Sequence, residues 1–271
     1  LSVENLQVQF QTKKGINTAV DGVSFSVEKG RILGIVGESG CGKSVTSMSI
    51  LQLLGSNARI SGGSIKLDGK ELIGLPEKEM CRIRGNDIAM IFQDPMTALN
   101  PTLTIGTQLM EPIMLHQNCG KKEAWTRAVD VLKRVGIAAP EKRMKEYPHQ
   151  LSGGMRQRAA LIRTLAVRPD ILLLDEPFSA LDYQTRLSVS DEIGTIIREE
   201  GKTAILVTHD ISEAISLSDR VVVLSKRPAS LKKIFPIQFS TKNHTPMQAR
   251  EAPEFKDYFN AIWKELDVHV S

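Results

Sequence analysis

The feature that most constrains this chain is the stretch Gly37–Ser44, which reads GESGCGKS and matches the pattern G-x-x-x-x-G-K-[ST]. The largely apolar run Arg31–Val36 before it predicts a short buried strand, and the apolar spacing of Ser44–Leu54 after it predicts a helix. A phosphate-binding loop requires this order of strand, glycine-rich loop and helix. The alternative, a chance glycine-rich turn, is disfavoured because both flanking elements are predicted.

The residue types in this loop suit a nucleoside triphosphate. Its glycines leave backbone N–H groups open to phosphate, and the following helix directs its positive end to the same place. We expect Lys43 to reach the β- and γ-phosphates and the Ser44 hydroxyl to bind Mg²⁺. ATP and Mg²⁺ are therefore the predicted cofactors. The residues expected to bind ATP here are Gly37, Glu38, Ser39, Gly40, Cys41, Gly42, Lys43, Ser44 and Val45.

Two acids follow the apolar run Ile171–Leu174, which predicts a second buried strand. Ligands bind at the carboxyl edge of a parallel sheet, where the last residues of such a strand lie. We expect Asp175 to hold Mg²⁺ opposite the Ser44 hydroxyl, and Glu176 to act as general base on the attacking water. The alternative is an acid pair that is solvated or caps the next helix, and the phosphate loop upstream favours catalysis.

Two further polar residues follow predicted strands. His209 comes after the strand Ala204–Thr208, where its donor could reach a γ-phosphate, although a lone histidine is more often a structural hydrogen-bonding group. Gln93 comes after the strand Ile88–Phe92, and its neutral amide can bind a metal ion or water. The predicted catalytic residues are Glu176, His209 and Gln93, and the predicted metal ligands are Ser44, Gln93 and Asp175.

The stretch Leu151–Gln157 predicts a second anion-binding site, because a serine and two glycines open another helix. Ser152, Gly153 and Gly154 would offer a hydroxyl and open N–H groups. The alternative for Ser152 is a simple N-cap. One nucleotide has a single γ-phosphate, so two such sites in one chain need an explanation.

The rest of the chain predicts an α/β architecture. Alternation of polar and apolar residues in Leu1–Val27 predicts an N-terminal antiparallel β layer, and Pro95–Tyr147 is helical in pattern. Alternating strands and helices predict a mostly parallel sheet. The further strands are Ser64–Leu67 and Val221–Leu224, and the further helices are Gly154–Ala166, Thr185–Glu200, Ser212–Leu217 and Glu254–Leu266.

We expect three parts. Residues 1–92 and 160–225 form an ATP-binding α/β core, residues 93–159 form an inserted helical subdomain, and residues 226–271 form a tail. Pro236–Glu251 is polar and predicted to be irregular, and the closing helix Glu254–Leu266 is expected to pack back on the core.

These motifs, with Ser179–Asp182, occur in the order found in the ATPase subunits of ABC transporters, which this chain resembles to about Leu224. The resemblance implies the ABC ATPase fold, a P-loop NTPase core, and ATP hydrolysis coupled to transport. It implies a head-to-tail dimer, homo- or hetero-, in which Ser152, Gly153 and Gly154 serve the partner subunit's nucleotide. Phe10 stands where the family places an aromatic residue that stacks on adenine; core packing is the rival role for Phe10.

The resemblance also implies partners. The Gln93 loop couples the site to transmembrane permease subunits, whose coupling helix docks near this loop and the helical subdomain, and a solute-binding protein takes part indirectly. Membrane contact would come only through those partners, at the cytoplasmic face of the inner membrane. The apolar runs Ile171–Leu174 and Ala204–Val207 are far shorter than the roughly 20 residues that span a bilayer.

The two halves of the chain resemble different importer branches. The stretch Ile91–Pro101, IFQDPMTALNP, is similar to peptide and nickel importers, whereas Asp175–Arg186, DEPFSALDYQTR, is similar to nitrate, sulfonate and taurine importers. Because the docking surface lies in the first half, peptide or nickel import is favoured, with the second group as the alternative. A soluble ABC ATPase acting on nucleic acid or ribosomes is disfavoured, because the chain shows one cassette and only 57 residues, without heptads, separate Gln93 from Leu151.

Overall fold

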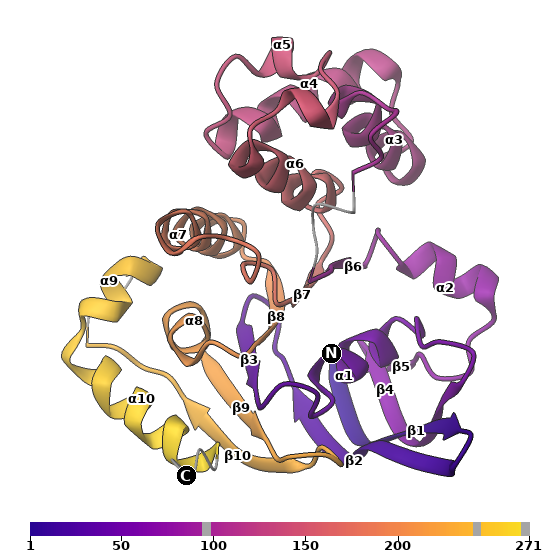
Figure 1. The fold of residues 1–271 in the computed structure, drawn as a ribbon. Coiled ribbons are helices and arrows are strands. Elements are labelled where there is room, and N and C mark those ends of the chain that lie inside the picture. Colours follow the sequence, from indigo (N-terminus) through magenta and orange to yellow (C-terminus); the bar gives the residue numbers. More distant parts are fainter. Residues whose placement is uncertain (94–98, 241–244, 267–271) are drawn as a thin grey trace.

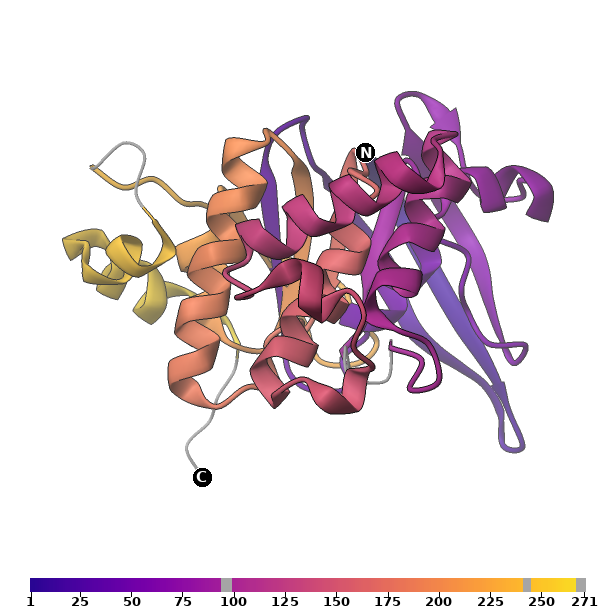
Figure 2. The same cartoon turned by 90° about the horizontal axis from the view of Figure 1, so that it is seen from above.

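The computed structural model describes residues 1–93, 99–240 and 245–266. It has two sheets, one of four strands and one of six, with helices on the outer face of the larger sheet (Figure 1). Both views place the C-terminal segment 245–266 (yellow) on the side of the molecule opposite the N-terminal antiparallel sheet (indigo) (Figure 2). The predicted α/β fold class is confirmed.

The N-terminal sheet is antiparallel, with strand order β2-β1-β4-β5. Residues Val3, Leu6 and Val8 are buried while their neighbours Glu4, Asn5 and Gln7 are exposed, as expected for a sheet with one face on the core. The antiparallel layer predicted for the N-terminus is confirmed. The strands are β1 Ser2–Thr12, β2 Gly15–Ser26, β4 Ala58–Leu67 and β5 Lys70–Glu71.

The larger sheet has the order β10-β9-β3-β8-β7-β6, and all neighbours are parallel except the edge strand β10. Its inner strands are continuous apolar runs because both faces are covered. In β7, Leu173 packs toward the N-terminal sheet, whereas Leu172 and Leu174 pack toward the helices. The strands are β3 Ile32–Val36, β6 Ile88–Ile91, β7 Ile171–Asp175, β8 Thr203–Thr208, β9 Arg220–Leu224 and β10 Leu231–Pro236.

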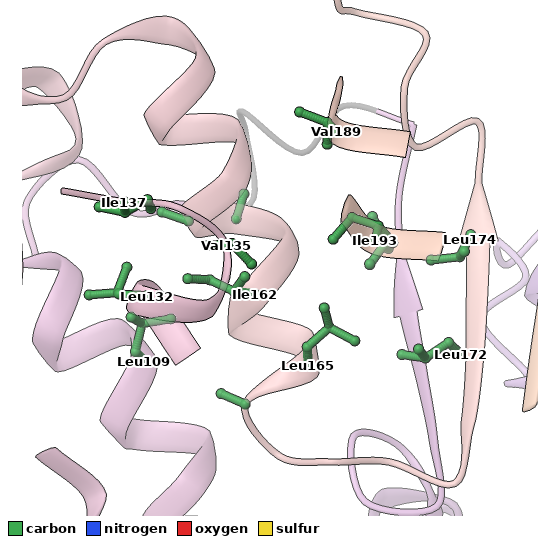
Figure 3. Packing of buried hydrophobic residues seen from close by; sticks show 14 of the residues in the cluster. Leu109, Leu132, Val135, Ile137, Ile162, Leu165, Leu172, Leu174, Val189 and Ile193 are labelled. Atoms are coloured by element: carbon green, nitrogen blue, oxygen red, sulfur yellow. The ribbon is translucent and has the colours of Figure 1, made fainter. Parts of the chain in front are cut away.

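A second group of helices lies above the larger sheet (Figure 1). One continuous core links the group to the sheet: Leu132 and Ile162 pack among the helices, and Leu165 lies between them and Leu172 (Figure 3). The predicted helical pattern before Tyr147 is confirmed, residues 95–98 lying outside the described part. The helices are α3 Ile105–Gln117, α4 Lys121–Arg134, α5 Pro140–Arg143, the short 3₁₀ turn Pro148–Gln150 and α6 Gly153–Leu165.

The remaining helices surround the larger sheet. Predicted helices after the phosphate loop, the Asp182 loop and His209 are confirmed within a few residues of their ends. The helix α2, near the edge of the sheet, was not predicted. The helices are α1 Lys43–Ile50, α2 Glu77–Ile83, α7 Tyr183–Glu199, α8 Ile211–Leu217, α9 Pro246–Glu251 and α10 Pro253–Glu265.

The tail is more regular than predicted. The expectation that Pro236–Glu251 is irregular is wrong at α9, which begins at the Thr245 capping box and buries Ala249. The strand β10 was also missed; it is an edge strand whose lysines face solvent, so its apolar signal is weak. The closing helix α10 packs on the core through Ile262, as predicted.

Among the described residues, no helix is both long and apolar enough to cross a bilayer. The boundaries of the three predicted parts stay a prediction. Residues 94–98 of the helical subdomain, and 241–244 and 267–271 of the tail, lie outside the described residues.

Candidate functional site

The phosphate loop connects β3 to α1 at the carboxyl edge of the larger sheet. Gly42 precedes the helix with a φ of 122°, and a Cβ there would lie 2.9 Å from the Ala19 carbonyl oxygen. Only glycine therefore fits at this position. Lys43 is 4% exposed, and its Nζ donates to the carbonyl oxygens of Gly37 at 2.8 Å and Glu38 at 3.0 Å.

The first predicted acid contacts the loop. The Ser44 hydroxyl donates to Asp175 Oδ1 at 2.9 Å, across the start of α1 and the end of β7. Burial raises the pKa of the Asp175 carboxyl above its ordinary value, opposed by this hydrogen bond. This hydrogen bond brings together two of the three predicted metal ligands, Ser44 and Asp175.

Glu176 lies where the ends of three strands meet. Its Oε2 accepts from Gln93 Nε2 at 3.0 Å and lies 3.1 Å from His209 Nδ1, while its Oε1 lies 4.0 Å from Lys43 Nζ. The parallel strands β6, β7 and β8 end at the same edge, so residues far apart in sequence converge there. Glu176 has a φ of 46°, and its N–H donates to the Val207 carbonyl oxygen at 2.8 Å. The backbone of Glu176 thus lies in a sparsely populated region of φ, which sets the direction of its side chain.

These groups line one end of a cleft of about 700 Å³. The same cleft is lined by Ser39, Gly40, Gly42 and Val45 of the loop and by Phe10 of β1. The part of the cleft around Phe10 is called its Phe10 end. Gly37, Glu38 and Cys41 belong to the loop but do not line this cleft. Burial raises the pKa of the Cys41 thiol above its ordinary value.

The donor set fits Mg²⁺. This hard ion prefers oxygen ligands, and it is usually bound through one or two protein groups together with substrate phosphates. Ser44 and Gln93 line the cleft and offer a hydroxyl and an amide oxygen. The Asp175 carboxylate is buried and does not line the cleft, but it lies behind the Ser44 hydroxyl, to which it is hydrogen-bonded. The described residues contain no cluster of three or more histidines, cysteines or acids that would hold a metal ion alone.

The second predicted anion site lies apart from the first. Ser152 caps α6, its Oγ accepting from the Met155 N–H at 3.4 Å, and Ser152 and Gly153 are exposed. None of Ser152, Gly153 and Gly154 is among the described residues that line the cleft. The helix α6 belongs to the upper helical group, away from the loop before α1 (Figure 1). One chain therefore does not bring the two anion sites together.

Sequence reasoning missed several residues at the Phe10 end of the cleft. Thr12, Asn17, Asn57 and Arg227 line it. These are common surface residue types without a motif. The one signal was the register of the first hairpin, which pairs Phe10 with Asn17.

The fold and the site together define a class. A phosphate loop at the carboxyl edge of a parallel sheet, an antiparallel N-terminal sheet and a separate helical group are the parts of an ATP-binding cassette. The ABC transporter family matches residues 20–179. The chain belongs to the ABC transporter family, and it is an ATP-binding ATPase whose hydrolysis is coupled to transport.

Its relatives include proteins named for peptide transport. It is 46% identical over 225 residues to the oligopeptide transport ATP-binding protein AppD of Bacillus subtilis, covering 83% of this chain and 69% of that protein. It is 49% identical to the dipeptide transport ATP-binding protein DppD of Bacillus subtilis, covering 83% of this chain and 67% of that protein. Among solved structures it is similar to an ATP-binding cassette in a dimeric post-hydrolysis state with ADP and phosphate, with a TM-score of 0.76 and 28% identity over 88% of this chain and 98% of that one.

Proposed function

We propose that this chain is the ATP-binding subunit of a peptide importer and that it hydrolyses ATP as a dimer. The observation that carries the proposal is the convergence on Glu176. Its carboxylate contacts Lys43, Gln93 and His209 at one end of the cleft. A carboxylate held among a cation and two polar groups beside a phosphate loop suits attack of water on a γ-phosphate.

Each of these residues would have a separate role in ATP hydrolysis. Lys43 would exchange its two backbone carbonyl acceptors for the β- and γ-phosphate oxygens, because charged oxygens are the stronger acceptors. Glu176 would accept the proton of the attacking water, and His209 and Gln93 would orient that carboxylate and the water. Ser44, Asp175 and Gln93 would hold Mg²⁺, which neutralises charge on the phosphates when bound. Phe10, which lines the same cleft, would stack on the adenine.

The second predicted anion site, Ser152, Gly153 and Gly154, supports a site shared between two subunits. Ser152 and Gly153 are exposed at the N-terminus of α6, yet they do not line this chain's own cleft. A helix N-terminus with open N–H groups binds phosphate. Ser152, Gly153 and Gly154 would therefore close over the γ-phosphate held by the partner subunit, in a homo- or heterodimer arranged head to tail.

A groove near Gln93 suits a transmembrane partner. It has a volume of about 290 Å³ and is mostly apolar. Its lining includes Phe92, which follows β6, Pro112 of α3, and Val167, which follows α6. Phe92 precedes Gln93 and is 47% exposed. An exposed aromatic next to a catalytic loop is a suitable contact for the permease helix that transmits the ATPase cycle. The chain would then lie at the cytoplasmic face of the inner membrane through its partners.

Peptides are the proposed substrate class, because the relatives AppD and DppD are named for oligopeptide and dipeptide transport. Nickel is a second candidate. The alternative is the nitrate, sulfonate and taurine group, whose importers the second half of the chain resembles. The test is uptake by cells whose gene for this chain is deleted. Loss of labelled dipeptide and oligopeptide uptake, with nickel and taurine uptake retained, is expected. Retained peptide uptake with loss of another substrate would overturn the assignment.

Restoration with variants links the uptake to the site. Cells that regain peptide uptake with the unchanged chain should not regain it with Lys43→Ala, which lacks the phosphate-binding cation. Equal restoration by Lys43→Ala would contradict a role for ATP at this loop.

A further inference from the structure

The turn after β9 reaches the Phe10 end of the cleft. The guanidinium carbon of Arg227 lies 5.8 Å from the centroid of the Phe10 ring, and both side chains line the cleft. Phe10 comes from β1, more than two hundred positions earlier in the chain. A cation and an aromatic ring from distant segments thus meet in the lining of the cleft.

The turn that carries Arg227 is fixed to the wall of the cleft. The Ala229 N–H donates to the Ala19 carbonyl oxygen at 2.9 Å, and the Ala229 carbonyl oxygen accepts from the Asp21 N–H at 2.8 Å. The Ser225 hydroxyl lies within hydrogen-bonding distance of the carbonyl oxygens of Lys226 at 2.9 Å and Pro228 at 3.1 Å. Because β2 also supplies Ala19 to the cleft, the backbone at Arg227 has a defined position relative to the site.

The guanidinium of Arg227 has donors left for a ligand. Arg227 is exposed, and no carboxylate in the described part of the chain forms an ion pair with it. The neighbouring Lys226 differs, because its Nζ lies 3.4 Å from Glu38 Oε1 of the phosphate loop. A guanidinium carries five N–H donors, is weakly hydrated and stacks readily on aromatic faces.

We propose that Arg227 is a nucleotide-positioning residue whose guanidinium covers the purine ring at the Phe10 end of the cleft. The inference rests on the proposed function, in which Phe10 contacts the base. The base would lie against the Phe10 ring and under the planar cation, which is attracted to an aromatic π face. The long, exposed side chain swings outward to admit the base, while the hydrogen-bonded turn keeps its reach constant.

The first measurement is the steady-state ATPase rate of the full chain. Arg227→Ala should raise the KM for ATP about 3- to 30-fold, the range expected for loss of one cation–π contact. The kcat should not change, because the described contacts of the Glu176 carboxylate are with Lys43, Gln93 and His209. Loss of the Arg227 side chain would then remove only uniform binding. Arg227→Lys keeps a cation and should recover part of the loss.

The matched control is Arg59→Ala. Arg59 is an exposed arginine of β4 whose Nη2 donates to Gln9 Oε1 at 3.3 Å, and it does not line the cleft. Its loss removes the same charge from the same side of the molecule and should leave the KM for ATP unchanged. Equal KM values for Arg227→Ala and Arg59→Ala would overturn the proposal.

Inorganic tripolyphosphate separates this inference from the proposed function. As a competitor of ATP it binds the phosphate loop but carries no base, so its inhibition constant should be the same for Arg227→Ala and the unchanged chain. An inhibition constant that rises together with the KM for ATP would show a phosphate contact or a distorted loop and would overturn base contact by Arg227. Failure of tripolyphosphate to inhibit the unchanged chain would instead contradict phosphate binding at Gly37–Ser44.

Discussion

Replacing Glu176 by glutamine tests the chemistry most sharply. The substitution keeps the size and shape of the side chain, and glutamine tolerates the φ of 46° no worse than glutamate. The amide oxygen can still accept a hydrogen bond from Gln93 or His209, but it cannot take a proton from water. Loss of a general base costs about 10²- to 10⁴-fold in rate, or about 2.7 to 5.4 kcal/mol of transition-state stabilisation.

ATP binding should survive this substitution. The Glu176 carboxylate lies 4.0 Å from Lys43 Nζ, where the attraction is on the order of 4 kcal/mol at an effective dielectric of 20. Removing that charge frees Lys43 for phosphate and removes repulsion between the carboxylate and the γ-phosphate. Binding of ATP should therefore be as tight or tighter, and the chain should accumulate as an ATP-bound dimer.

The assay is single-turnover release of phosphate, with bound ATP and dimer measured by filter retention and size-exclusion chromatography. The control is Glu79→Gln, which removes an exposed carboxylate of α2 that pairs with Lys70 at 2.8 Å, away from the cleft. That variant should hydrolyse ATP at the unchanged rate. A Glu176→Gln rate within about tenfold of the unchanged chain would refute the general-base assignment.

Three further predictions concern the loop and the core. Gly42→Ala should abolish ATP binding measured by calorimetry, because the added Cβ would lie 2.9 Å from the Ala19 carbonyl oxygen at a φ of 122°. The control Gly153→Ala, with no atom within 4 Å of the added Cβ, should bind ATP normally in the monomer. Leu132→Ala should lower the free energy of unfolding in urea by about 2 to 5 kcal/mol, because Leu132 is fully buried in the core of Figure 3, whereas Leu115→Ala, 75% exposed, should change it little. Burial raises the pKa of the Glu213 carboxyl above 4.5, so the folded chain keeps a proton that the unfolded chain loses. The free energy of unfolding therefore falls as the pH rises above 4.5. Glu213→Gln has no such proton, so its stability relative to the unchanged chain should rise over the same pH interval; a difference independent of pH would contradict the burial argument.

The phosphate end of the site could be predicted from sequence because its residues follow buried parallel strands. Apolar runs identify β7 and β8. Because parallel strands end at the same edge of a sheet, Glu176 and His209 are expected at that edge independently of the other elements. The contact between Ser44 and Asp175 follows from the same rule applied to the loop after β3. Roles for these residues stay predictions until variants are measured.

The base end could not be predicted because no local pattern encodes it. Asn17 and Asn57 reach the cleft only through strand pairing, and Arg227 only through a turn bound to β2. The strand β10 was missed because its exposed lysines hide the alternation of an edge strand, and α9 because its six residues are too few for helical periodicity. The positions of Asn17, Asn57 and Arg227 in the cleft depend on long-range strand pairing and not on residue type.

The central claim is that each ATP is hydrolysed between the phosphate loop of one subunit and the Ser152 helix of the other. Mixing Lys43→Ala chains with Ser152→Arg chains tests it directly, because each variant alone lacks one half of every site. The mixture should regain about a quarter of the unchanged rate, since random pairing makes half of the dimers mixed, each with one intact site. A mixture no more active than the two variants alone, despite mixed dimers detected by differential tagging, would contradict head-to-tail sharing.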